Sequence, residues 1–269
     1  MRRAGVLFAA ATLAVGCGQS HAHQVLADTA HNLSKIHSGD LTLRLVVSPR
    51  QGTKGRIGFE LSGPFALRPG ALPIAKVAYT QIAGANEATA TFISTGVKAY
   101  AEVSGKVYEL PESATETVRR AAGGIGGSSG FGGLDIASWV SHPRVGSAGS
   151  TDHVSADLDV VNAANGLLGL LHGLGRDVPT IQGDEADRLR DAVDSSSFDV
   201  WSGRSDHLLR RLSMKAADLG LNVPEDLRPV LGNVVAARID FELAVAHPNQ
   251  AVRVPAPAHA LPSSSLPGG

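Results

Sequence analysis

The chain has little cysteine, few aromatic residues and no excess of either charge. Its 269 residues include one cysteine and 4% aromatic residues, and 24 Lys and Arg stand against 25 Asp and Glu, a formal net charge of −1. One cysteine excludes an intrachain disulfide framework, a multi-cysteine zinc site and an iron–sulfur cluster. Nucleic acid is not expected as a partner, because proteins hold it through a basic surface.

Sequence signatures of catalysis are also missing. The chain has no G-x-S-x-G nucleophile elbow: the match to that spacing at residues 126–130 lies in a glycine-rich stretch and not between a strand and a helix, so a serine hydrolase is the weakest functional class. The glycine-rich stretch 123–133 lacks the GxGxxG spacing of a phosphate-binding loop and is expected to be a mobile loop. We therefore expect a protein that is not an enzyme and that carries no cofactor.

The N-terminus has the pattern of a secretory signal peptide. Met1–Arg3 is positively charged, residues 4–15 are apolar apart from Thr12, and Gly16 and Cys17 follow. The segment is too short to cross a bilayer as a permanent helix. Its end resembles a bacterial lipobox, which implies cleavage before Cys17 and a diacylglycerol on the thiol; an ordinary signal peptide with a chance cysteine is the alternative. The prediction is a signal peptide over 1–16, a lipidated polar tether over 17–23, and a lipid anchor on the extracytoplasmic side of the cell membrane.

Apolar residues recur with a period of two over much of the chain, which predicts strands. The predicted strands cover residues 41–48, 57–61, 74–82, 88–95, 97–103, 106–110, 152–160, 198–201, 207–216 and 235–245. Helical patterns separate these groups, at residues 25–36, 112–122, 134–140, 161–174 and 183–193, with a helical turn at 224–231. No proline-rich linker divides the chain, so one α+β domain over 24–254 is favoured, followed by a disordered tail over 255–269.

The densest titratable cluster is on the predicted strand 152–160. His153, Asp157 and Asp159 share one face of it, an arrangement that a metal site would need. The other face of the same strand is apolar, so a solvated outer face of a sheet explains the cluster. No metal site is expected.

An apolar sheet face covered by helices that are apolar all round can leave a cavity, and apolar cavities take apolar ligands. The pattern does not distinguish such a cavity from a filled interior. The candidate cavity residues are taken from the apolar rows: Leu43, Leu45, Ile57, Phe59, Leu158, Leu168, Ile239 and Phe241.

The order of elements and several short motifs resemble the LppX/LprG group of actinobacterial lipoproteins, a group similar in fold to the LolA and LolB lipoprotein carriers. The motifs lie at residues 97–103, 133–135, 151–159, 198–201, 208–212 and 254–257. The resemblance implies a strongly curved antiparallel sheet, a half-open β-barrel, with helices on its concave side enclosing an apolar cavity. It also implies binding or transport of lipids or lipoglycans in the cell envelope. The alternative is a lipid-free scaffold that binds another envelope protein through its surface.

Overall fold

Eleven antiparallel strands form one sheet in the part of the chain described by the computed structural model, which covers residues 16–51, 55–126, 134–173, 179–220 and 236–265. The order across the sheet is β6-β5-β4-β3-β2-β1-β11-β10-β9-β8-β7. The strands are β1 Ser38–Gln51, β2 Ile57–Ala66, β3 Ile74–Ala83, β4 Asn86–Thr95, β5 Ala99–Val103, β6 Lys106–Glu109, β7 Val140–Ala148, β8 Thr151–Leu158, β9 Ser195–Gly203, β10 Leu209–Gly220 and β11 Ala236–Ala246.

The sheet consists of two meanders that meet at its centre. One runs from β1 to β6 and the other from β7 to β11, and the pairing of β1 with β11 joins them. Leu45 of β1 lies opposite Phe241 of β11, so the first and last long strands of the chain share one apolar row. The sheet is open, with β6 and β7 at its two edges.

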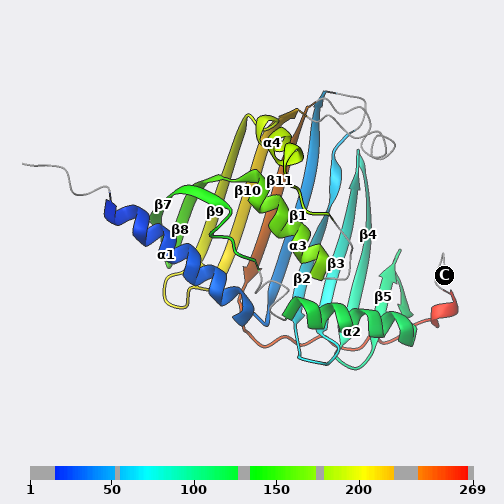
Figure 1. Cartoon of the computed structure of the whole chain (residues 1–269). Coiled ribbons are helices and arrows are strands. Elements are labelled where there is room, and N and C mark those ends of the chain that lie inside the picture. The colour runs from blue at the N-terminus through cyan, green and yellow to red at the C-terminus, as the bar shows by residue number, and fades with distance from the viewer. Residues whose placement is uncertain (1–15, 52–54, 127–133, 174–178, 221–235, 266–269) are drawn as a thin grey trace, which may run out of the picture.

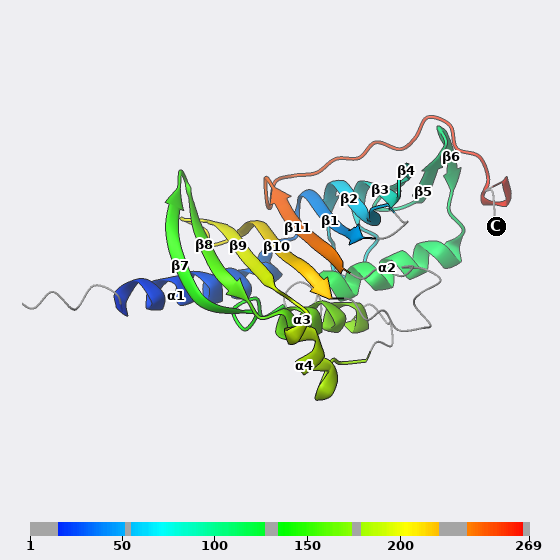
Figure 2. The same ribbon diagram turned by 90° about the horizontal axis from the view of Figure 1, so that it is seen from above.

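All four α-helices of the described chain lie on the same face of this sheet (Figures 1 and 2). They are α1 Gly16–Asn32, α2 Glu112–Gly126, α3 Val160–Gly173 and α4 Asp184–Asp191. We call the face that they cover the inner face and the opposite one the outer face. The helix-covered arrangement confirms an α+β fold with an open antiparallel sheet.

The core is filled on one half of the inner face and open on the other. Strand register places five side chains in line across the sheet, here called the central row: Phe198, Met214, Phe241, Leu45 and Phe59. Phe198 is 0% exposed and Met214 5%, whereas the other three are only half-buried. The buried half lies beside α1, whose Val25 and Leu26 belong to the same hydrophobic cluster as Phe198.

The sequence prediction was wrong for residues 134–140, which form turns that lead into strand β7 and not a helix. The β7–β8 register shifts between Ser141 and Arg144, and His142 between them has φ +49°. This bulge breaks the period of two, which is why the strand is absent from the sequence pattern. Helix α2 also extends to Gly126, into the stretch predicted as a loop.

Both predicted terminal segments have more structure than expected. The tether 17–23 lies within α1, with Ala22 buried and His21 and His23 exposed. The tail is not disordered over 255–265: it runs in extended form back to β6, where the amide of Leu261 donates to the Val107 carbonyl at 2.8 Å. The predicted signal peptide up to residue 15 and the helical turn at 224–231 lie outside the described residues.

Candidate functional site

The inner face carries an apolar pocket of about 140 Å³ where β1, β11 and β10 face α3 and α4. All twelve residues that line it are Leu, Ile, Val, Ala, Met or Phe. The strands contribute Leu45, Met214 and Phe241, and the helices contribute Leu167 and Leu189 among others. The pocket therefore offers contact area to an apolar group and no polar side chain to fix a reacting one.

Helix α3 is held over the sheet by polar contacts at its first turns. The Asp159 carboxylate accepts hydrogen bonds from the backbone amides of Val161 and Asn162 at 3.1 and 3.0 Å, which caps the helix. The Asn165 side chain bonds both backbone groups of Ile181, at 2.8 and 3.0 Å. These contacts fix the helical wall of the pocket at one end.

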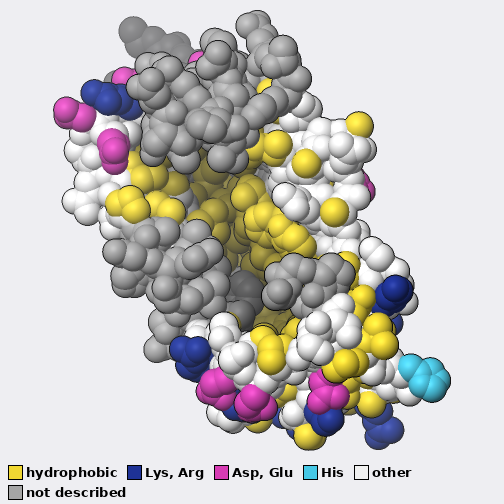
Figure 3. All heavy atoms as spheres, turned by 90° about the vertical axis from the view of Figure 1, so that its right-hand side faces the viewer, with side chains coloured by type: hydrophobic (Ala, Val, Ile, Leu, Met, Phe, Trp, Pro, Cys, Tyr) yellow, Lys and Arg dark blue, Asp and Glu magenta, His cyan; other side chains and the backbone are white. Residues whose placement is uncertain are grey.

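The apolar surface continues beyond this pocket along the open half of the sheet. The ring of Phe59 lies 6.3 Å, centroid to centroid, from that of Tyr79, which is 42% exposed. Figure 3 shows hydrophobic side chains lining a hollow on this side of the molecule. The pocket alone is smaller than the roughly 300–1,000 Å³ of usual ligand sites, and the exposed rows beside it extend the contact area.

The structure brings together four of the eight residues predicted to line a cavity: Leu45, Leu158, Ile239 and Phe241 line the apolar pocket. Leu43 packs against the filled core, and Ile57 and Phe59 share the face of Leu45 farther out on β2. Leu168 lies on α3, half-buried and outside the pocket lining.

Sequence reasoning missed the contributions of β10 and of the helices. Met214 and Ala216 line the pocket from β10, and their period of two with Leu212 was the signal that could have found them. Leu167 and Leu189 face the pocket from α3 and α4. In α3 apolar residues lie all around the helix, so the sequence pattern does not show which side of the helix faces the pocket.

The titratable cluster on β8 is divided among three separate contacts. His153 Nε2 lies 2.8 Å from Asp199 Oδ1, and Asp157 Oδ2 lies 3.2 Å from His142 Nδ1. Asp159 caps α3. Among the residues that the structure describes, no three His, Cys, Asp or Glu side chains come together as metal ligands.

Cys17, the predicted lipid-attachment residue, lies in the first turn of α1. That helix packs into the core through Ala22, Val25 and Leu26, and the first of these lies five residues after Cys17. Within the described chain, every helix is too short or too polar to cross a bilayer.

Comparison with known proteins gives fold likeness only. No family model and no curated protein matches the chain. Solved structures similar to it include LprF from Mycobacterium bovis, with 13% identity over 90% of this chain and 99% of that chain and a TM-score of 0.42. A LolA superfamily protein from Nitrosomonas europaea has 11% identity over 83% of this chain and 93% of that one, with a TM-score of 0.22. Both structures belong to the groups that the sequence motifs resemble, and at these TM-scores the likeness assigns no role to any residue.

Proposed function

We propose that this protein binds the acyl chains of membrane lipids or lipoglycans along its inner face and holds or carries them in the cell envelope, without catalysing a reaction. One observation supports this most directly: the central row is fully buried at Phe198 but only half-buried at Phe241, Leu45 and Phe59. Covering apolar surface contributes about 25 cal/mol per Å². A long apolar ligand lying on this row would shield from water the apolar side chains that the rest of the chain leaves half-buried.

The chemistry of the lining selects acyl chains over polar ligands. A polar group placed in the apolar pocket would lose its hydrogen bonds to water and find no side-chain partner among the lining residues. Phe59 is followed across the sheet by Gln81, which is exposed. We infer that acyl chains lie between Phe59 and the pocket and that the polar end of the ligand points toward β3.

The proposed anchor would keep this face close to the lipid supply. Acylated Cys17 would start a helix that packs on the sheet, so the anchor would be joined to the fold by a short rigid connection. Two acyl chains are enough for stable membrane attachment, since each buried CH₂ contributes about 0.8 kcal/mol. In this proposal the half-open sheet faces the extracytoplasmic surface of the cell membrane.

Photocrosslinking of the full-length chain tests the proposal. The protein is incubated with phosphatidylcholine vesicles that carry a diazirine in the acyl chain, irradiated, and digested for mass spectrometry. Crosslinks are expected in peptides from β1, β2, β11 and α3, which carry the inner-face residues. Crosslinks confined to the N-terminal segment would show that the protein contacts lipid only through its membrane anchor, and the lipid-binding proposal would be wrong.

Polar substitutions separate lipid binding from folding. Leu45→Gln and Phe241→Gln place an amide in the half-buried part of the row and should reduce crosslinking at least threefold. Val97→Gln is the matched control, because Val97 is 81% exposed and lies outside the row. Equal crosslinking in all three folded variants would contradict the assigned lining.

A further inference from the structure

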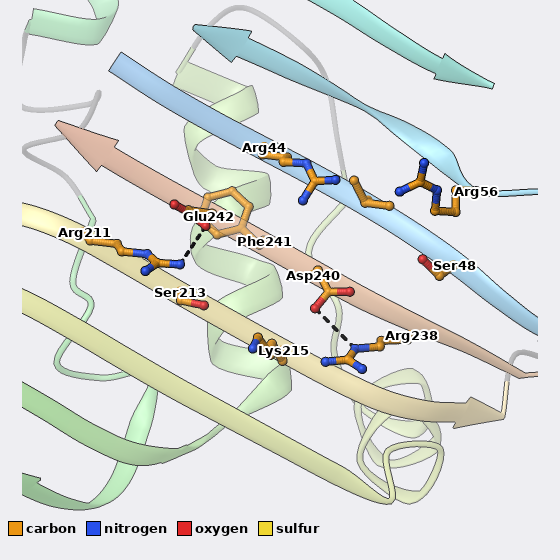
Figure 4. Close-up of a pocket in the computed structure, with 11 residues that line it drawn as sticks. Arg44, Ser48, Arg56, Arg211, Ser213, Lys215, Arg238, Asp240, Phe241 and Glu242 are labelled. Atoms are coloured by element: carbon orange, nitrogen blue, oxygen red, sulfur yellow. Dashed lines mark hydrogen bonds and ion pairs between the residues drawn. The ribbon is translucent and has the colours of Figure 1, made fainter. Parts of the chain in front are cut away.

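The outer face has a pocket of its own, on the opposite side of the sheet from the apolar one. It measures about 350 Å³ and lies over β2, β1, β11 and β10, which are neighbours in the sheet. Figure 4 shows the charged side chains on one side of the strands, with the helices behind the sheet. Because residues alternate between faces, Arg44 and Arg238 point outward while Leu45 and Ile239 point inward.

The outer pocket holds more positive charge than the carboxylates around it neutralise. Five cations line it: Arg44, Arg56, Arg211, Lys215 and Arg238. Three carboxylates pair with three of these cations. The pairs are Arg44 with Glu60 at 3.6 Å, Arg211 with Glu242 at 2.9 Å and Arg238 with Asp240 at 3.3 Å.

The remaining two cations have no counter-charge. The side chains of Arg56 and Lys215 make no hydrogen bond or ion pair with any residue that the structure describes. Lys215 lies opposite Asp240 in the strand register, but that carboxylate pairs with Arg238 instead. Two uncompensated cations in one concave site produce a positive potential that attracts anions.

A serine hydroxyl also lines the same pocket. Ser213 is 7% exposed as a whole residue, and its Oγ makes no hydrogen bond with any residue that the structure describes. It is not among the fully buried side-chain atoms without a partner, which in the described chain are Ser202 Oγ and His207 Nδ1, so it remains open to the pocket. A ligand oxygen above Ser213 would satisfy this hydroxyl and would lie between the cations of the pocket.

One guanidinium of the pocket is held in place from outside it. Arg211 lies over the ring of Trp201, 5.1 Å from its centroid, while it pairs with Glu242. The ring of Trp201 also stacks on the imidazole of His153, with centroids 4.5 Å apart and planes 7° apart. An arginine fixed in this way loses less conformational freedom when it binds an anion.

We propose that the outer pocket binds a phosphate-bearing anion, either a free diphosphate-type compound or the phosphorylated headgroup of a lipid. The surplus of two cations matches a dianionic group, and guanidinium forks together with a hydroxyl donor suit tetrahedral phosphate oxygens. The volume of about 350 Å³ is at the lower end of the usual range for small-ligand sites. This site lies across the sheet from the apolar pocket and does not depend on acyl-chain binding there.

Calorimetric titration of the full-length chain with sodium pyrophosphate at low ionic strength tests the site. Lys215→Gln and Arg56→Gln should each weaken binding about tenfold, because charge-assisted hydrogen bonds are lost, and neither leaves a carboxylate unpaired. Ser213→Ala should weaken binding without lowering the melting temperature, since its hydroxyl has no internal partner. Lys76→Gln is the control, because Lys76 is exposed on β3 and outside the pocket.

A second arm identifies the source of the phosphate. Phosphatidylcholine vesicles with and without phosphatidylglycerol are mixed with the same variants, and pyrophosphate is added as a competitor. Pyrophosphate-sensitive binding to the anionic vesicles that Lys215→Gln weakens identifies a lipid headgroup. Pyrophosphate binding without such vesicle binding identifies a free phosphate compound. No pyrophosphate binding, or equal binding by all variants including Lys76→Gln, would overturn the proposal.

Discussion

The indole of Trp139 lies against the backbone of Gly166 with no room for a side chain between them. A Cβ atom built at Gly166 would lie 2.6 Å from Trp139 Nε1, well inside van der Waals contact. Trp139 itself is 2% exposed and belongs to the core cluster. This close approach sets how near α3 lies to the sheet, and so the depth of the apolar pocket beside it.

Gly166→Ala is therefore expected to destabilise the protein. The added methyl group must displace a buried indole or move α3, and overpacking of this kind costs about 1–3 kcal/mol. The measurement is the free energy of unfolding from urea denaturation followed by circular dichroism.

Gly169→Ala on the same helix is the matched control. A Cβ at Gly169 meets nothing within 4 Å, and replacing glycine by alanine in an unstrained helix stabilises by about 0.4–1 kcal/mol. The two substitutions should thus have opposite signs. A stabilising Gly166→Ala would show that Trp139 does not fix the position of α3.

The long strands could be predicted because their environment is periodic. In β1 and β11 the apolar residues face the helices and the charged ones face outward, so Leu45 and Phe241 are recognisable from spacing alone. Strand β7 could not be predicted, because the bulge at His142 interrupts that period. The sequence does contain a signal for α1. Helical spacing connects four residues that the structure buries: Ala22, Val25, Leu26 and Thr29.

The candidate site was predictable on its strand side and not on its helix side. The pairing of Leu45 with Phe241 follows once β1 and β11 are known to be neighbours, but that pairing joins segments about 200 residues apart, which no local pattern encodes. In α3, Leu167 faces the pocket and Leu168 does not, although both lie in a uniformly apolar helix. The outer pocket was missed because its cations come from three separate strands and from Arg56, which directly precedes β2.

The contact between the tail and β6 should be visible in amide hydrogen exchange. The Glu109 amide donates to the Leu261 carbonyl and the Leu261 amide donates to the Val107 carbonyl, each at 2.8 Å. The tail thereby covers part of an edge strand that would otherwise expose unpaired backbone groups. In the full-length chain, the Glu109 and Leu261 amides should exchange more slowly than that of Ala260, which makes no such bond.

Leu261→Pro removes one donor of this pair, because proline has no amide hydrogen. It should speed exchange at Glu109 about tenfold or more, since loss of about 1.4 kcal/mol corresponds to a factor of ten. Leu261→Ala keeps the amide and should leave the Glu109 rate close to that of the unmodified chain. Equal Glu109 rates in all three proteins would show that the tail is not docked in solution.

Acylation of Cys17 is testable directly. A bacterial host that expresses the full chain is labelled with an alkyne analogue of palmitate, and the purified protein is analysed by intact mass spectrometry. We expect loss of residues 1–16 and addition of a diacylglycerol at Cys17, the only cysteine of the chain. Cys17→Ser should abolish the label. An unlabelled chain cleaved elsewhere would indicate an ordinary signal peptide, and label on Cys17→Ser would show that the acyl group is attached at another residue.

The carboxylate of Asp206 should make stability depend on pH in the acid range. Partial burial alone would raise the pKa of this carboxyl, but hydrogen bonds from Arg210, at 2.6 Å, and from the Leu208 amide, at 3.1 Å, outweigh burial and lower the pKa below its ordinary value of 3.8. A carboxylate with a lowered pKa in the folded state stabilises the protein above its unfolded pKa. That stabilisation is lost as the pH falls through the folded pKa.

Asp206→Asn removes this charge with little change of shape. The free energy of unfolding of the unmodified chain should exceed that of the variant by up to about 1 kcal/mol at neutral pH, a small value because the pair is partly exposed and screened. The difference should stay constant down to about pH 4 and then shrink toward zero on further acidification, because both proteins are then uncharged at this position. Raising the salt concentration at pH 7 should reduce it as well. A difference that is the same at pH 2 and pH 7 would show that the ion pair with Arg210 does not contribute to stability.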